Sequence, residues 1–108
     1  MSRGDLLIPS NFIQLCEGAW GISSGGKQIL ICGGCRSQDL DEILGHFFWD
    51  IVVFRHACPR ISESQTAQLV GITCIADGSL RDFELKRIKS AVPDVFITSV
   101  AGAWSNIP

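Results

Sequence analysis

The chain has 108 residues, of which 46% are hydrophobic and 19% charged, and its formal net charge is −2. This composition argues against a disordered chain and fits one domain with a sizeable core. A slight negative charge without a cluster of Lys and Arg gives no general attraction to nucleic acid or to an anionic membrane. Because the sequence shows no apolar run of signal-peptide or membrane-spanning length, we expect a cytoplasmic protein.

Runs of β-branched and aromatic residues bounded by turn formers predict four strands. The region before the first of them, 10–20, is a weak helix candidate, and the glycine-rich 21–27 is expected to be a loop. The predicted strands lie at 28–32, 51–55, 70–75 and 95–100.

The intervals between the predicted strands carry the helix signals. Apolar residues recur at helical spacing in 37–49 and 79–92, where we expect amphipathic helices that begin at the N-caps Ser37 and Ser79. A shorter and weaker helix is expected at 62–69.

Alternating strands and helices define the fold class that we predict. The strands are nearly continuous apolar runs, which is typical of a sheet covered on both faces. We therefore expect a single α/β domain over residues 1–108, with a mostly parallel four-stranded sheet and helices on both faces. Right-handed crossovers would place the carboxyl ends of the strands at one edge, where open α/β sheets bind ligands.

Two of the five cysteines flank a pair of glycines in the sequence CGGC, between strand 28–32 and helix 37–49. An odd number of cysteines without an export signal argues against a disulfide framework. The helix dipole and Arg36 would lower the pKa of a thiol in this motif, and the thiolate either ligates metal or attacks a disulfide. Of the remaining cysteines, Cys16 and Cys74 are expected to fill the core.

The next predicted strand ends in a histidine and a further cysteine, two residues apart. If strands 28–32 and 51–55 are parallel neighbours, their carboxyl ends bring these groups together. Three thiols and an imidazole are a known structural zinc set, and thiolate-rich sites also suit iron–sulfur clusters. The sequence thus predicts a metal site with zinc or an iron–sulfur cluster, held by Cys32, Cys35, His56 and Cys58.

The CGGC motif after a strand, followed by a helix and a strand that ends in "HAC", resembles the CGGC-domain proteins, small metal-binding domains rich in cysteine and histidine. The likeness covers about residues 28–60. It implies that Cys32, Gly33, Gly34, Cys35 and Cys58 have the roles of the family's residues, with His56 as the nearest histidine. The family has further cysteines ahead of its CGGC motif, where this chain has only Cys16, and the second half shows no match.

Two other classes of function remain open. The first is a thiol–disulfide oxidoreductase in which the helix N-terminus activates Cys32 or Cys35. The second is an interaction module without chemistry, which pairs with itself as a homo-oligomer, or with a partner, through a sheet edge or its tryptophans. The tryptophans are Trp20, Trp49 and Trp104.

Overall fold

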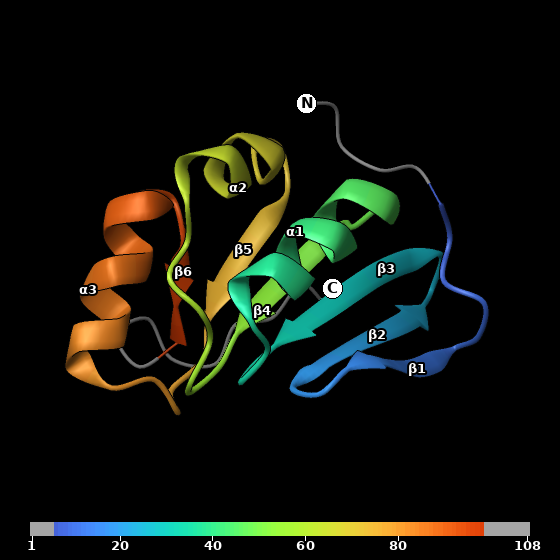
Figure 1. Cartoon of the computed structure of the whole chain (residues 1–108), viewed down its shortest axis with the longest axis horizontal. Coiled ribbons are helices and arrows are strands. Elements are labelled where there is room, and N and C mark those ends of the chain that lie inside the picture. The colour runs from blue at the N-terminus through green and yellow to red at the C-terminus, as the bar shows by residue number, and fades with distance from the viewer. Residues whose placement is uncertain (1–5, 99–108) are drawn as a thin grey trace.

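The computed structural model describes residues 6–98, which form six strands and three helices (Figure 1). Residues 99 and 100 of the predicted strand 95–100, and Trp104, lie outside this range. In chain order the elements are β1 (Phe12–Cys16), β2 (Ala19–Ser24), β3 (Lys27–Cys32), α1 (Ser37–His46), β4 (Ile51–Phe54), α2 (Glu63–Gln68), β5 (Thr73–Ala76), α3 (Asp82–Ala91) and β6 (Phe96–Ile97).

The strands form one mixed sheet whose spatial order, β1-β2-β3-β4-β5-β6, follows the chain. Strands β1, β2 and β3 pair antiparallel, whereas β3, β4, β5 and β6 pair parallel. The predicted α/β class is therefore confirmed. The predicted number of four strands is wrong, because the described residues form six, and the sheet is parallel only in part, because the first three strands make an antiparallel meander.

The two additional strands come from segments that we expected to be a helix and a loop. Residues 10–20 form β1 and the start of β2, and they turn back at Gly18, whose φ is +87°. Residues 21–27 complete β2 and reverse at Gly25 and Gly26, both with positive φ. Two glycines in this conformation between the paired residues Ser24 and Lys27 make a tight hairpin turn. The apolar spacing alone did not distinguish this hairpin from a helix and a loop.

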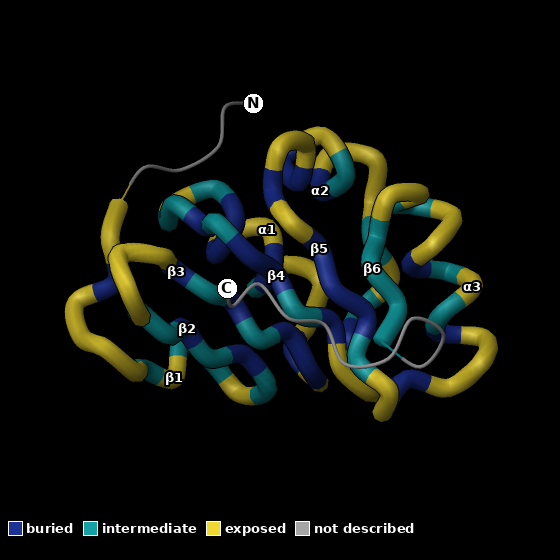
Figure 2. The backbone as a smooth tube through the Cα atoms, turned by 180° about the vertical axis from the view of Figure 1, so that it is seen from behind, coloured by how far each residue is buried: buried dark blue, intermediate teal, exposed yellow. Residues whose placement is uncertain are grey.

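All three helices lie on one face of the sheet (Figure 1), whereas we had predicted helices on both faces. The strand order explains the difference. The parallel strands advance in a single direction from β3 to β6, and crossovers of the usual right hand then place every connecting helix on the same side. Seen from behind, the strands stand in front, and no helix of residues 6–98 covers that face (Figure 2).

The core lies between the sheet and the helices. Leu30, Val52 and Cys74 are paired across β3, β4 and β5, and all three are buried. Leu40 and Leu44 of α1 belong to the same buried cluster. Each large apolar side chain removed from water in this way stabilises the fold by about 1.5–3 kcal/mol. The core thus holds β3 and β4 side by side, and it fixes the carboxyl end of β3, where the CGGC motif begins.

The helix boundaries differ from the predicted ones at both long helices. Helix α1 ends at His46 because Phe47 forms a β-bridge with Leu6 instead of continuing the helix. Helix α3 begins only at Asp82, since Ser79 does not cap it and its hydroxyl instead accepts a hydrogen bond from the His56 backbone N–H. No helix within residues 6–98 is long and apolar enough to cross a membrane.

Helix α2 begins with a capping box that also ties it to α1. The Ser62 hydroxyl accepts a hydrogen bond from the Gln65 backbone N–H, and the Gln65 side chain accepts one from the Ser62 N–H. The same Gln65 side chain is fully buried and donates to the Ser37 carbonyl and to the Asp41 carboxylate, both in α1. The short helix is thereby anchored to its neighbour.

Removing this cap gives a modest prediction. We expect Ser62→Ala to lower the free energy of unfolding by about 1 kcal/mol, because the first turn of α2 loses a hydrogen-bond acceptor. Urea denaturation followed by circular dichroism measures the change. The control is Ser90→Ala in α3, an exposed position where we expect a change within about 0.5 kcal/mol. Equal effects of the two substitutions would show that the cap contributes nothing.

Candidate thiol site

The antiparallel meander brings two cysteines distant in sequence close to each other. Cys16 ends β1 and pairs with Ala19 of β2, and Ala19 pairs on its other side with Cys32, the last residue of β3. The two cysteines therefore lie on either side of β2, at the end of the sheet where the CGGC loop begins. This arrangement depends on the pairing of β1 with β2, where the sequence predicts a helix and a loop.

The CGGC loop packs directly on the turn between β1 and β2. The Gly33 N–H donates to the Gly18 carbonyl at 2.7 Å, and the Cys35 N–H donates to the Gly33 carbonyl at 2.9 Å. A Cβ atom added to Gly18 would lie 2.5 Å from the carbonyl carbon of Gly34. The backbone at Gly18 is therefore in direct contact with the backbone of the CGGC loop, and only glycine at position 18 permits this contact. The contact holds the loop close to β1.

The sulfur atoms of Cys32 and Cys35 are 3.6 Å apart, within hydrogen-bonding distance of each other. Both residues are buried, with exposed fractions of 0% for Cys32 and 5% for Cys35. Cys35 stands two residues ahead of Ser37, the first residue of α1. The predicted pairing of the two motif cysteines at a helix N-terminus is thus observed.

The two thiols of the motif differ in their acidity. The pKa of Cys35 is lowered, mainly because its sulfur accepts a hydrogen bond from the Cys32 thiol. The backbone N–H of Cys35 and the Cys16 thiol lower this pKa further. Burial and the charge of Asp39 raise it, but their effect is smaller. The same hydrogen bond, together with burial, raises the pKa of Cys32 well above its ordinary value. The thiolate of the pair therefore forms on Cys35.

Arg36 lowers the pKa of the Cys16 thiol. Its guanidinium forms an ion pair with Asp39 at 3.2 Å, within the first turn of α1. The Asp39 carboxylate therefore lies near the Cys35 thiol as well, and its negative charge raises the pKa of Cys35. The pKa of Cys35 is lowered by hydrogen bonds from thiols and from a backbone amide, which cannot be inferred from the sequence.

Cys16 is a third member of the thiol cluster, which we define as Cys16, Cys32 and Cys35. Its thiol interacts with that of Cys35, and burial followed by the charge of Cys35 raises the pKa of Cys16. The residue is half-buried and thus more accessible than the other two. Cys16 packs against the core, as predicted, but only the pairing of β1 with β2 and of β2 with β3 reveals the thiols beside it. Cys74, in contrast, is a buried core thiol, as predicted.

Cys58 lies after β4 and is 3% exposed. Burial is the main reason that its pKa is raised to about 11, and the charges of Glu84 and Cys35 act in the same direction. It also contributes to the raised pKa of Cys32. Cys58 is therefore within electrostatic range of the thiol cluster, but it has no hydrogen bond to any of the three thiols.

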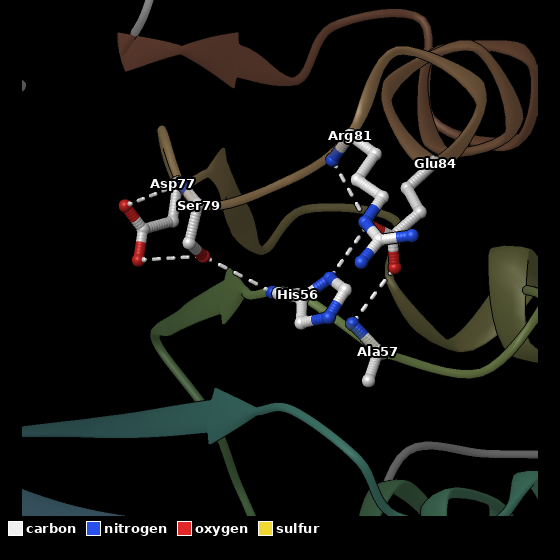
Figure 3. A network of polar contacts seen from close by, with 6 residues as sticks. All are labelled: His56, Ala57, Asp77, Ser79, Arg81 and Glu84. Carbon is white, nitrogen blue, oxygen red and sulfur yellow. Dashed lines mark hydrogen bonds and ion pairs between the residues drawn. The ribbon is translucent and has the colours of Figure 1, made fainter.

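The His56 side chain points toward Glu84 of α3 (Figure 3). Its Nδ1 lies 3.1 Å from Oε1 of Glu84, and its backbone N–H donates to the hydroxyl of Ser79. Over residues 6–98, no three His, Cys, Asp or Glu side chains are placed to hold one metal ion. The metal site of Cys32, Cys35, His56 and Cys58 stays a prediction.

Glu84 is the polar residue at this end of the sheet that the sequence reading missed. It is 2% exposed, and its carboxylate accepts hydrogen bonds from the backbone N–H groups of Arg81 at 2.9 Å and Ala57 at 2.7 Å. Although burial opposes ionisation, these bonds and His56 lower the pKa of Glu84 to about 2. The carboxylate thus stays ionised and fixes the segment after β4.

A hollow of about 390 Å³ opens at the carboxyl edge of the sheet, beside the CGGC loop. Gly33 and Gly34 form part of its wall, and Arg55, His56 and Ser79 form another part. The Arg55 guanidinium is held by Asp77 at 3.1 Å, across the ends of β4 and β5. The backbone of the motif is therefore reached from this edge, where open α/β sheets bind their ligands.

Comparison with known proteins gives no match to a family model, to a curated protein or to a solved structure. The resemblance to CGGC-domain proteins therefore stays a prediction that rests on residues 28–60.

The acidity difference predicts an order of thiol modification. As the pH rises from 6 to 10, we expect Cys35 to reach half-maximal alkylation at the lowest pH, because its pKa is lowered while that of Cys16 is raised. Cys58 and Cys74, with pKa values of about 11, and Cys32, whose pKa is raised well above its ordinary value, stay below half-maximal alkylation up to pH 10. Short iodoacetamide pulses read by peptide mass spectrometry give a midpoint for each cysteine that titrates within this range. A midpoint for Cys35 at or above that of Cys16 would contradict the proposed ionisation.

Proposed function

We propose that Cys32 and Cys35 form a dithiol–disulfide couple, which makes the protein a thiol–disulfide oxidoreductase. The observation that carries the proposal is the 3.6 Å separation of the two sulfurs, with the lowered pKa on one of them. Because a disulfide bond is about 2.05 Å long, only a short movement separates the reduced pair from its oxidised form.

The direction of the pKa shifts assigns a role to each sulfur. The Cys35 thiolate attacks one sulfur of a substrate disulfide, forms a mixed disulfide and releases the first substrate thiolate. Cys32 then loses its proton and attacks the Cys35 sulfur, which forms the Cys32–Cys35 disulfide and releases the second substrate thiolate. The substrate gains two electrons and the protein loses two. The second step is aided because the mixed disulfide removes the Cys35 charge that raises the pKa of Cys32.

Burial restricts the substrate. With Cys35 only 5% exposed, a large protein disulfide has poor access to its sulfur. A low-molecular-weight disulfide is small enough to approach a sulfur at this depth. We therefore assign small disulfides as the substrate class.

The test is a redox titration. Protein equilibrated in glutathione buffers of graded ratio is acid-quenched, its free thiols are alkylated, and its disulfides are identified by peptide mapping. We expect one two-electron transition that links Cys32 to Cys35 and that is absent in Cys35→Ser. The control is Cys74→Ala, which removes a core thiol outside the cluster and leaves the couple in place. Five free thiols in every buffer, or a disulfide between other cysteines, would reject the proposal.

Metal binding is the second candidate function, and the number of thiols near the motif favours it. Cys16 and Cys58 both interact electrostatically with the Cys32 and Cys35 pair, and thiolate-rich sites suit zinc or an iron–sulfur cluster. Elemental analysis and an absorption spectrum of anaerobically purified protein decide between the candidates. About one equivalent of zinc, or an iron–sulfur spectrum, with at least three thiols protected from alkylation selects the metal site. A metal-free protein with the redox transition selects the couple.

A further inference from the structure

A second cavity, a groove of about 620 Å³, lies between α3 and the segment that leads into α2. These elements are neighbours on the helical face of the sheet (Figure 1). One wall includes Arg60, Ile61 and Thr66, and the other includes Lys86, Arg87 and Ser90. None of the thiols described above lines this groove, so it is a separate site.

The groove concentrates positive charge in a chain that is negative overall. Arg60, Lys86 and Arg87 line it, against a single carboxylate from Glu63. Within residues 6–98 none of the three cations takes part in an ion pair, because the ion pairs there involve Arg36, Arg55 and His56. Three unpaired cations in one cavity would attract an anion that the net charge of −2 does not.

Arg87 carries the most specific observation. Its Nε atom is buried, and no acceptor for it lies in the part of the chain that the structure describes. Its guanidinium is held over the ring of Phe83, with 5.4 Å between the guanidinium carbon and the ring centroid. A buried donor without a partner destabilises the fold, so such a group is expected to meet an acceptor in the functional state.

We propose that this groove binds a small organic phosphate monoester. A phosphate dianion balances the excess of three cations over one carboxylate, and its oxygens match the planar fork of an arginine. The hydroxyls of Thr66 and Ser90 are further donors on the two walls. Ile61 and Ala91 supply an apolar surface for the organic part of the ligand, and Glu63 accepts a hydrogen bond from a ligand hydroxyl.

Binding is tested with phenyl phosphate as the probe, followed by amide chemical shifts of isotopically labelled full-length protein. We expect saturable shifts at Ile61, Thr66, Ser90 and Ala91, with weaker binding of inorganic phosphate. Arg87→Gln should weaken binding at least about tenfold, and Lys86→Gln about threefold. The matched control is Lys89→Gln, the same charge change on the same helix but outside the groove, with an effect below about twofold.

Each alternative result has a defined meaning. Absence of saturable shifts, or equal weakening by Lys86→Gln and Lys89→Gln, would overturn the site. Benzoate binding as tight as that of phenyl phosphate would overturn the choice of a phosphate over a carboxylate. If Arg87→Gln does not fold, the exposed Lys86 and Lys89 variants still decide. The outcome is independent of the redox titration, since no thiol takes part.

Discussion

Gly18→Ala is expected to lower the free energy of unfolding by about 3–5 kcal/mol. Gly18 has a φ of +87°, in the left-handed region that disfavours a side chain. A Cβ added there would lie 2.5 Å from the Gly34 carbonyl carbon and 2.6 Å from the Cys35 nitrogen. Both obstacles are backbone atoms, which cannot rotate away as a side chain can. The CGGC loop must therefore move, and the Cys32–Cys35 pair moves with it.

The control for this substitution is Gly25→Ala in the hairpin turn between β2 and β3. Gly25 also has a positive φ, of +59°, but an added Cβ would meet nothing within 4 Å. It isolates the backbone strain, about 1–2 kcal/mol, from the steric clash. Urea denaturation of both variants gives the difference. Equal losses would mean that the contact between Gly18 and the CGGC loop is not maintained in solution.

Glu84→Gln is expected to destabilise the protein by about 2–3 kcal/mol at pH 7. The Glu84 carboxylate accepts hydrogen bonds on both oxygens, from the Arg81 and Ala57 N–H groups. A glutamine of the same shape can accept on one side only, so its NH₂ group then faces a backbone donor. The hydrogen bond from the Ala57 N–H also holds Ala57 at a φ of +70°, which is unusual for a residue other than glycine. A glutamine whose NH₂ group faces Ala57 no longer holds that conformation.

This loss should depend on pH in a defined direction. The pKa of Glu84 is lowered in the folded protein to about 2, from the ordinary value of 4.5. The ionised carboxylate therefore contributes its full stabilisation above about pH 4.5, and the contribution is lost as the pH falls toward 2. We expect the stability difference between the native protein and Glu84→Gln to shrink across this interval.

Urea denaturation at several pH values between 7 and 2.5 measures this difference. Glu42→Gln is the matched control, because Glu42 is an exposed carboxylate of α1, where we expect a change within about 0.5 kcal/mol at pH 7. A Glu84→Gln effect that is constant with pH would show that its charge does not stabilise the fold. Its side-chain shape alone would then account for the loss.

The parallel half of the fold could be predicted from the sequence, and the antiparallel half could not. Apolar runs marked β3, β4 and β5 to within a few residues, and helical spacing marked α1 and α3. The first strands were missed because Phe12, Ile13 and Leu15 fit a helical face as well as a strand. Only the conformations of Gly18 and Gly25, which the letters do not display, decide between the two.

The candidate site was predicted in part for the same reason. The Cys32 and Cys35 pair follows from local chain geometry, since a strand, two glycines and a helix bring the residues together. Cys16 depends on long-range pairing in the missed hairpin. His56 lies at the expected end of β4, but the direction of its side chain is set by Glu84, from a helix much later in the chain.

The antiparallel meander also has a consequence for the order of folding. Cys16, Cys32 and Cys35 all come from residues 12–35, which are joined by two tight turns, whereas β4, β5 and β6 must each wait for a crossover through a helix. Short loops close faster than long ones, and local pairing precedes parallel pairing. We therefore expect the sulfur atoms to meet before the rest of the sheet assembles. A disulfide between Cys32 and Cys35 can therefore form while the second half of the chain is still unstructured.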